Sequence, residues 1–263
     1  MKITANGISM NYTLDGPASA PVVTLSHSLA TTLAMWEPQL KALTARWRVL
    51  AYDTRGHGGT DAPRGAYSLE QLADDAQALL RALGIQRTHW VGLSMGGMIG
   101  QTLALKAPEL FTSLSLCDTS SRIPPEAKPL WDERVHTAET QGMEPLVEPT
   151  LSRWFTGPFK QKGGAVLETV RAMIRSTPAA GYIGCCQAIS GLNLTDRIGV
   201  IKLPTLIIVG EEDQGTPVAA SKVMNEKIRG SELVILKSAS HLANMEQPEA
   251  FTSALTGFLG KSS

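Results

Sequence analysis

The stretch Gly92-Leu93-Ser94-Met95-Gly96 decides the fold, because it places one serine between two runs of different periodicity. The residues before it, Thr88-His89-Trp90-Val91, predict a buried strand, and residues 97–105 predict a helix with small residues on its sheet-facing side. G-x-S-x-G in this setting is typical of a nucleophile elbow, a strained turn that holds the serine hydroxyl above a sheet. The pattern therefore predicts that Ser94 is a nucleophile, rather than part of a tight turn that merely packs well.

A nucleophilic serine needs a base, and the base needs an acid to orient it. Asp213 follows the carboxyl end of an apolar strand predicted over residues 203–210, and His241 follows a second one predicted over residues 233–236. The chain order serine, acid, histidine is the one that accompanies such an elbow. We therefore expect Ser94, Asp213 and His241 to meet at one edge of a parallel sheet.

Other carboxylates compete for the role of the acid. Glu211 and Glu212 neighbour Asp213, and Asp118 follows a strand predicted over residues 113–117, from which it could also reach the histidine. We favour Asp213, and Asp118 remains open as the second choice. Structural or surface roles are expected for Arg55, which braces its turn, and for the other histidines, which are His27, His57, His89 and His136.

The oxyanion of an acyl-transfer reaction needs two backbone donors. One is expected from Met95, directly after the serine, and the other from Leu29, in the loop that follows the strand predicted over residues 22–25. This loop contains His27-Ser28, where many related loops have His-Gly, so its second residue departs from the usual glycine.

Composition narrows the class of protein. Lysine plus arginine equals aspartate plus glutamate at 24 each, which argues against nucleic acid or an anionic membrane as a partner. The three cysteines form no disulfide framework and, with no signal peptide or membrane-spanning run, predict a cytoplasmic protein. We expect no metal, because no cluster of His, Cys, Asp and Glu has metal-ligand spacing. We expect no cofactor, because no G-x-G-x-x-G follows a strand and there is no P-loop lysine. The sequence does not decide the oligomeric state, and an oligomer is compatible with it.

Strands and helices alternate over residues 21–117 and again over residues 203–260, after an opening hairpin across Asn6-Gly7. This pattern predicts an α/β fold with a doubly wound, mostly parallel sheet. We expect residues 1–118 and 196–263 to form this core and residues 119–195 to form a helical cap over the catalytic edge. Within the core the predicted helices lie near residues 35–46, 68–83, 98–106, 217–229 and 248–259. In the cap they lie at residues 126–141, 143–154, 166–176 and 179–189.

With these motifs in place, the chain resembles the α/β-hydrolases and, more narrowly, the 3-oxoadipate enol-lactonases of aromatic degradation. The generic part of the likeness is the elbow together with Asp53-Thr54-Arg55-Gly56-His57-Gly58. The specific part lies in residues 26–31, 116–123 and 181–189, so it includes the cap. The resemblance implies hydrolysis of a small unsaturated lactone that carries a carboxylate, giving 3-oxoadipate in the β-ketoadipate pathway.

A substrate of this kind would need a cation in a mostly apolar pocket. The candidates are Arg122, Arg134 and Arg153, with Trp131 as a wall and Trp154 and Tyr182 as further cap residues that could face the ligand. The alternative functions are a general carboxylesterase or another lactonase, and a non-catalytic small-ligand receptor of the same fold. A dehalogenase or epoxide hydrolase is disfavoured, because those relatives carry aspartate where this chain has Ser94. The oxyanion loop also lacks the proline that cofactor-free haloperoxidases often carry.

Overall fold

The computed structural model describes residues 1–262 of the chain, and its eight strands form a single sheet in the order β1-β2-β4-β3-β5-β6-β7-β8. β1 pairs with β2 and β2 with β4 in antiparallel register, and the other neighbours are parallel. The strands are β1 (Lys2–Ala5), β2 (Ile8–Asp15), β3 (Val22–Ser26), β4 (Arg48–Tyr52), β5 (Thr88–Leu93), β6 (Phe111–Cys117), β7 (Thr205–Gly210) and β8 (Glu232–Leu236). The predicted mostly parallel sheet and its opening hairpin are confirmed.

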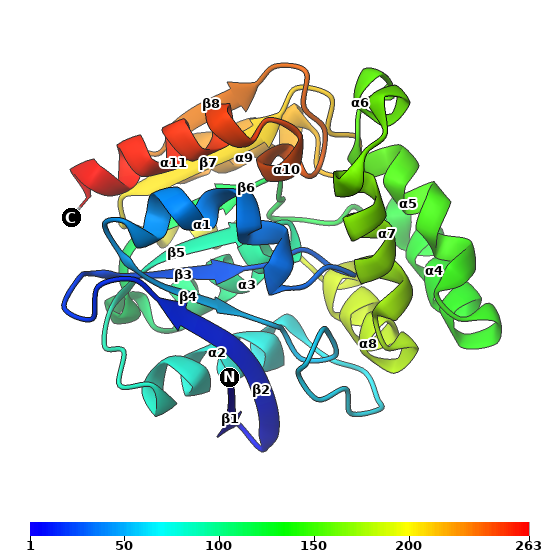
Figure 1. Cartoon of the computed structure of the whole chain (residues 1–263), viewed down its shortest axis with the longest axis horizontal. Coiled ribbons are helices and arrows are strands. Elements are labelled where there is room, and N and C mark those ends of the chain that lie inside the picture. Colours follow the sequence, from blue (N-terminus) through cyan, green and yellow to red (C-terminus); the bar gives the residue numbers. More distant parts are fainter. Residues whose placement is uncertain (263) are drawn as a thin grey trace.

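Helices cover both faces of the sheet, as predicted for a doubly wound fold. α1 (Glu37–Thr44) and α11 (Pro248–Lys261) contact each other on one face, and α2 (Leu69–Ala82), α3 (Met95–Lys106) and α9 (Val218–Lys227) lie on the other (Figure 1). A short α10 (Ala243–Glu246), which the sequence pattern did not predict, precedes α11. In the part of the chain that the structure describes, no helix is both long and apolar enough to cross a membrane.

β5 and α3 form the strand–turn–helix unit that carries Ser94. All six residues of β5 are buried because the strand lies between β3 and β6 and is covered on both faces. α3 begins at Met95, earlier than the predicted start near Met98. The reason is that the carbonyl of Ser94 already accepts the N–H groups of Gly97 and Met98, so the first helical turn grows directly out of the elbow.

Five helices lie between β6 and β7, at the end of the sheet toward which the parallel strands point (Figure 1). α4 packs on α8, and α5 packs on α7. Three of the four helices predicted here agree within one or two residues, whereas the one expected over residues 143–154 begins as a 3₁₀ turn, Glu144–Leu146, before α5. α6 was not predicted. The five are α4 (Lys128–Gln141), α5 (Val147–Trp154), α6 (Gly157–Lys162), α7 (Ala165–Ser176) and α8 (Ala179–Ser190).

A buried ion pair ties the loop after β4 to α2. The Arg55 guanidinium donates from Nε and Nη2 to the two carboxylate oxygens of Asp75, at 2.6 and 2.7 Å. Both side chains are almost completely buried, and Asn6 donates a further hydrogen bond to the Asp75 carboxylate. The expectation that Arg55 braces its own turn is therefore confirmed, with α2 supplying the partner.

We expect Asp75→Ala to lower the free energy of unfolding by about 3–5 kcal/mol, because it leaves the Arg55 charge buried without a partner. The neighbouring residue supplies the control: Asp74 pairs with Lys106, and both of those side chains are more than 40% exposed. Asp74→Ala should cost at most about 1 kcal/mol. Urea unfolding of the two variants decides the matter, and equal losses would show that the buried pair has no special weight.

Candidate active site

Ser94 sits at the sharpest backbone turn of the site. Its φ of 53° and ψ of −114° lie outside the regions that L-residues normally adopt. A Cβ on Gly92 would approach the carbonyl oxygen of Gly96 to 2.2 Å, and a Cβ on Gly96 would approach the carbonyl oxygen of Ser26 to 2.1 Å. The two flanking glycines are therefore required by the close approach of strand and helix, and the predicted elbow is confirmed.

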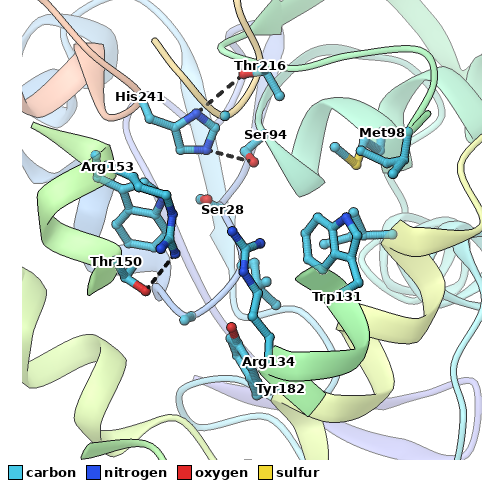
Figure 2. A pocket seen from close by; sticks show the side chains of 16 residues that line it. Ser28, Ser94, Met98, Trp131, Arg134, Thr150, Arg153, Tyr182, Thr216 and His241 are labelled. Atoms are coloured by element: carbon cyan, nitrogen blue, oxygen red, sulfur yellow. Dashed lines mark hydrogen bonds between the residues drawn. The ribbon is translucent and has the colours of Figure 1, made fainter. Parts of the chain in front are cut away.

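Three residues from three loops form one chain of hydrogen bonds. His241 Nε2 lies 3.0 Å from Ser94 Oγ, and His241 Nδ1 lies 2.8 Å from Asp213 Oδ2 (Figure 2). The loops follow β5, β7 and β8, so the carboxyl edge of the sheet brings the three side chains together as predicted. An imidazole held between a carboxylate and a hydroxyl can take the hydroxyl proton and be stabilised as it becomes positive.

The Asp213 carboxylate is held by its own turn as well as by the histidine. Oδ1 accepts the N–H groups of Gly215 and Thr216, at 2.8 and 3.0 Å, and Oδ2 accepts the Thr216 hydroxyl at 2.6 Å. Burial opposes ionisation, but the charge and hydrogen bond of His241 and the Thr216 donors outweigh it and lower the pKa of Asp213. Thr216 was missed from the sequence, where a threonine three residues after an acid at a strand end is only a weak turn signal.

The competing acids are not in a position to act. Glu211 and Glu212 are exposed, and the ring of His241 makes its hydrogen bonds to Asp213, Thr216 and Ser94 instead. Asp118 is fully buried, and its Oδ1 accepts the N–H of Gly210 at 2.7 Å rather than that of His241. Burial and the nearby Asp213 charge raise the pKa of Asp118 well above its ordinary value, which favours the neutral acid.

The loop that carries His241 is fastened to the cap. The buried Glu246 carboxylate accepts the N–H groups of Thr156 and Ser240, at 3.0 and 2.8 Å, and also the Thr156 hydroxyl. Trp154, which was predicted as a cap residue near the ligand, stacks on the imidazole of His241, with ring centroids 5.9 Å apart and planes 29° apart. The cap thus contacts the base directly and limits its movement.

The two expected oxyanion donors come from two different segments. Leu29 belongs to the loop after β3 and lines the pocket, and Met95 is the first residue of α3. Neither N–H donates a hydrogen bond to any other group within residues 1–262. The Gly96 N–H donates to the carbonyl of His27 at 3.1 Å, which joins the loop to the elbow. Both amides are therefore free to bind a developing negative charge.

Two buried histidines brace the loop that contains Leu29. His27, in this loop, accepts the Thr54 N–H at Nε2, and His57, in the loop after β4, accepts the Ala30 N–H at Nε2, both at 2.9 Å. Burial lowers the pKa of His27 and lowers that of His57 to about 3, so both rings stay neutral and keep an acceptor nitrogen. The structural role expected for His57 is confirmed.

The pocket beside Ser94 and His241 carries two arginines from the cap. Arg134 lies with its Cζ 4.5 Å from the ring centroid of Trp131, as their spacing on one helix predicted, and its Nε is buried without a partner. Arg153 donates to the Thr150 hydroxyl at 3.2 Å, and burial together with the Arg134 charge lowers the pKa of Arg153.

No carboxylate balances these two charges. None of the residues that line the pocket, all of them in the described part of the chain, is an aspartate or glutamate. The arginines that pair with carboxylates within residues 1–262 are Arg55, Arg171 and Arg175. In Figure 2 the Arg134 guanidinium extends toward Ser28 and Ser94, Tyr182 lies beside Arg134, and Arg153 lies on the His241 side of the pocket. The pocket is thus locally cationic in a chain with no net charge.

The prediction that Arg122 enters this pocket is wrong. Arg122 is exposed and does not line the pocket, and its backbone forms an isolated bridge with Asn193. It lines a separate surface hollow with Ser120 and Pro124.

Across residues 1–262 no group of His, Cys, Asp and Glu side chains is arranged to hold a metal ion.

A family model described as alpha/beta hydrolase fold matches residues 21–248. The chain belongs to this family. It is 36% identical over 253 residues to 3-oxoadipate enol-lactonase 2 of Acinetobacter baylyi, a match that covers 96% of this chain and 94% of that protein. The predicted resemblance to the α/β-hydrolases and to the enol-lactonases is confirmed, and the chain is an enzyme of the hydrolase class.

Solved structures agree with this assignment. The enol-lactonase from Burkholderia xenovorans superposes with a TM-score of 0.95 at 38% identity. The superposition covers 99% of this chain and 100% of that one. A thermophilic esterase from Thermogutta terrifontis with malate bound has a TM-score of 0.94 at 30% identity, with 100% and 98% of the two chains covered. Both superpositions therefore cover the five helices between β6 and β7 as well as the sheet.

We expect Asp213→Asn to lower kcat for a chromogenic ester such as 4-nitrophenyl acetate by about four powers of ten, because an amide cannot stabilise the imidazolium or fix its tautomer. Asp118→Asn is the matched control. It should retain most of the rate, since Asp118 makes no hydrogen bond to His241 and asparagine keeps both its shape and an acceptor for the Gly210 N–H. Steady-state kcat values of both folded variants test this prediction. A larger loss of kcat in Asp118→Asn would show that Asp118, at the end of β6, is the acid that orients the histidine.

Proposed function

We propose that the protein is a serine hydrolase that opens 3-oxoadipate enol-lactone to 3-oxoadipate through an acyl-enzyme. The observation that carries the proposal is the pairing, in one pocket, of the Ser94–His241–Asp213 hydrogen-bond chain with two unpaired arginines. A hydrolase of neutral esters has no need of two half-buried positive charges in its pocket. Enol-lactonases with similar sequence along nearly the whole chain support the same substrate.

In the first half of the reaction, Ser94 Oγ attacks the lactone carbonyl while its proton passes to His241 Nε2. The oxyanion is bound by the N–H groups of Leu29 and Met95. The bond from the carbonyl carbon to the ring oxygen then breaks, and His241 returns the proton to the leaving enol oxygen. The ring opens without loss of a fragment, because acyl group and leaving group belong to one molecule.

In the second half, water attacks the acyl-enzyme and gives a proton to His241, which passes it to Ser94 Oγ as the ester bond breaks. The product carboxylic acid ionises in solvent, and the enol tautomerises to the ketone. Asp213 supports both halves by holding the imidazole through Nδ1, at 2.8 Å. The only partner this chemistry needs is a small molecule, and three buried free thiols suit the cytoplasm that the composition predicts.

The substrate carboxylate is assigned to Arg134 and Arg153. A carboxylate that enters a partly dry pocket needs donors that carry charge, and a guanidinium supplies them in a fork. The stacking of Arg134 on Trp131 holds one such fork in place without using its N–H groups. The esterase relative with malate bound is a protein of this fold that takes a small dicarboxylate. Ester hydrolysis without an anionic substrate is the second candidate function, because the same relative is described as an esterase.

Ser94→Ala should lower kcat by three or more powers of ten and leave the fold intact, because the side chain lies at the pocket surface rather than in the core. A fluorophosphonate probe should add one phosphonyl group to the wild type and none to this variant, as read by intact-protein mass. Circular dichroism confirms that the variant is folded. A folded Ser94→Ala variant with a near-normal kcat would exclude Ser94 as the nucleophile.

Arg134→Met and Arg153→Met should each raise KM for the anionic enol-lactone by roughly one to two powers of ten, the value of a charge-assisted contact. The measurement is the change in KM for the anionic lactone divided by the change in KM for an uncharged ester. Arg122→Met is the control, since it removes a cap arginine that lies outside the pocket. If all three variants behave alike, the natural substrate is not bound through its charge.

A further inference from the structure

The Ser28 hydroxyl is a buried polar group that the mechanism above does not use. The residue is 0% exposed, and its Oγ has no hydrogen-bond partner within residues 1–262. Leaving such a hydroxyl unpaired costs on the order of 1–3 kcal/mol. Three other buried hydroxyls also lack a partner, those of Thr54, Ser115 and Ser221, but Ser28 is the one that lines the pocket. Figure 2 shows it there with Ser94 and His241.

The backbone around Ser28 is fully engaged, so its side chain is the part left to meet a ligand. The Ser28 carbonyl accepts from His27 Nδ1 at 2.7 Å and from the Thr31 hydroxyl at 2.8 Å. Its N–H points at the sulfur of Met35, at 3.3 Å. These contacts fix the direction of the Cα–Cβ bond and leave only the rotation of the hydroxyl free.

The segment that follows is held just as firmly. Ala30 has a φ of +56°, a left-handed conformation that costs a residue with a Cβ on the order of 1–2 kcal/mol. His57 Nε2 accepts the Ala30 N–H at 2.9 Å, and this bond keeps the strained residue in place. Ser28, Leu29 and Ala30 all line the pocket, so this braced segment forms one of its walls.

We propose that the Ser28 hydroxyl is a third donor to the carbonyl oxygen of the substrate, acting beside the N–H groups of Leu29 and Met95. The proposal rests on the proposed acyl transfer at Ser94. The oxygen of a tetrahedral intermediate carries a full charge and has room for three donors, whereas the ground-state carbonyl needs at most two. A side-chain donor here strengthens its bond as the charge develops, and the binding of the ester itself changes little.

A side-chain donor, unlike a backbone amide, can be removed by mutation. Ser28→Ala should lower kcat for 4-nitrophenyl acetate by roughly tenfold to a hundredfold, with little change in KM. It should weaken inhibition by an alkyl boronic acid, which forms a tetrahedral anion on Ser94, by a similar factor. Ser28→Cys keeps the shape but offers a weak S–H donor, so it should behave like the alanine variant.

Ser115→Ala is the matched control, because it removes an equally buried, unpartnered hydroxyl from β6, away from the pocket. It should leave kcat and the boronic acid affinity unchanged. Circular dichroism and thermal melting establish that each variant folds.

Three results would overturn the proposal. One is wild-type kinetics in Ser28→Ala, and another is full activity in Ser28→Cys beside a slow Ser28→Ala, which would assign the loss to packing. The third is a rise in KM for the anionic lactone alone, which would place the hydroxyl on the substrate carboxylate. An inactive wild type, or an active Ser94→Ala variant, would contradict both the serine mechanism and this inference. An active wild type with an unaffected Ser28→Ala removes the third donor only.

Discussion

The left-handed backbone of Ser94 is the constraint on which the rest of the site depends. It costs on the order of 1–3 kcal/mol and survives because β3, β5 and α3 meet around Gly92 and Gly96 at distances that leave no room for a side chain. The same contact brings the Gly96 N–H to the carbonyl of His27 and so fixes the oxyanion loop to the elbow. The hydroxyl and its two neighbouring amides are thus placed by backbone, which needs no rearrangement during the reaction.

Charge in this protein is local. The chain has no net charge, so it offers no long-range attraction to an anion. The cap instead places Arg134 and Arg153 in one partly dry pocket, where burial and the Arg134 charge lower the pKa of Arg153. In the proposed function, a substrate carboxylate pairs with both guanidiniums and offsets their mutual repulsion, so two like charges in one pocket give selectivity for an anion.

The sequence was enough to predict the sheet, the elbow and the three residues of the hydrogen-bond chain, because each follows an apolar strand and strand ends meet at one edge. It could not place Arg122, since that depends on a bridge to Asn193, seventy-odd positions further along the chain. It placed Arg134 because Trp131 lies one helical turn away. Roles that depend on contacts between loops, such as those of Thr216 and Glu246, have only weak signals in the sequence.

The histidines show how surroundings, rather than residue type, decide function. His27 and His57 each face a backbone N–H with Nε2 and a backbone carbonyl with Nδ1, so only the neutral ring satisfies both contacts. Protonation would set N–H against N–H, and burial opposes it further. His241 faces a carboxylate with one nitrogen and a hydroxyl with the other, and both of these contacts tolerate or favour a proton on the ring. Two imidazoles in one neighbourhood therefore hold a loop still, and the third can carry the proton.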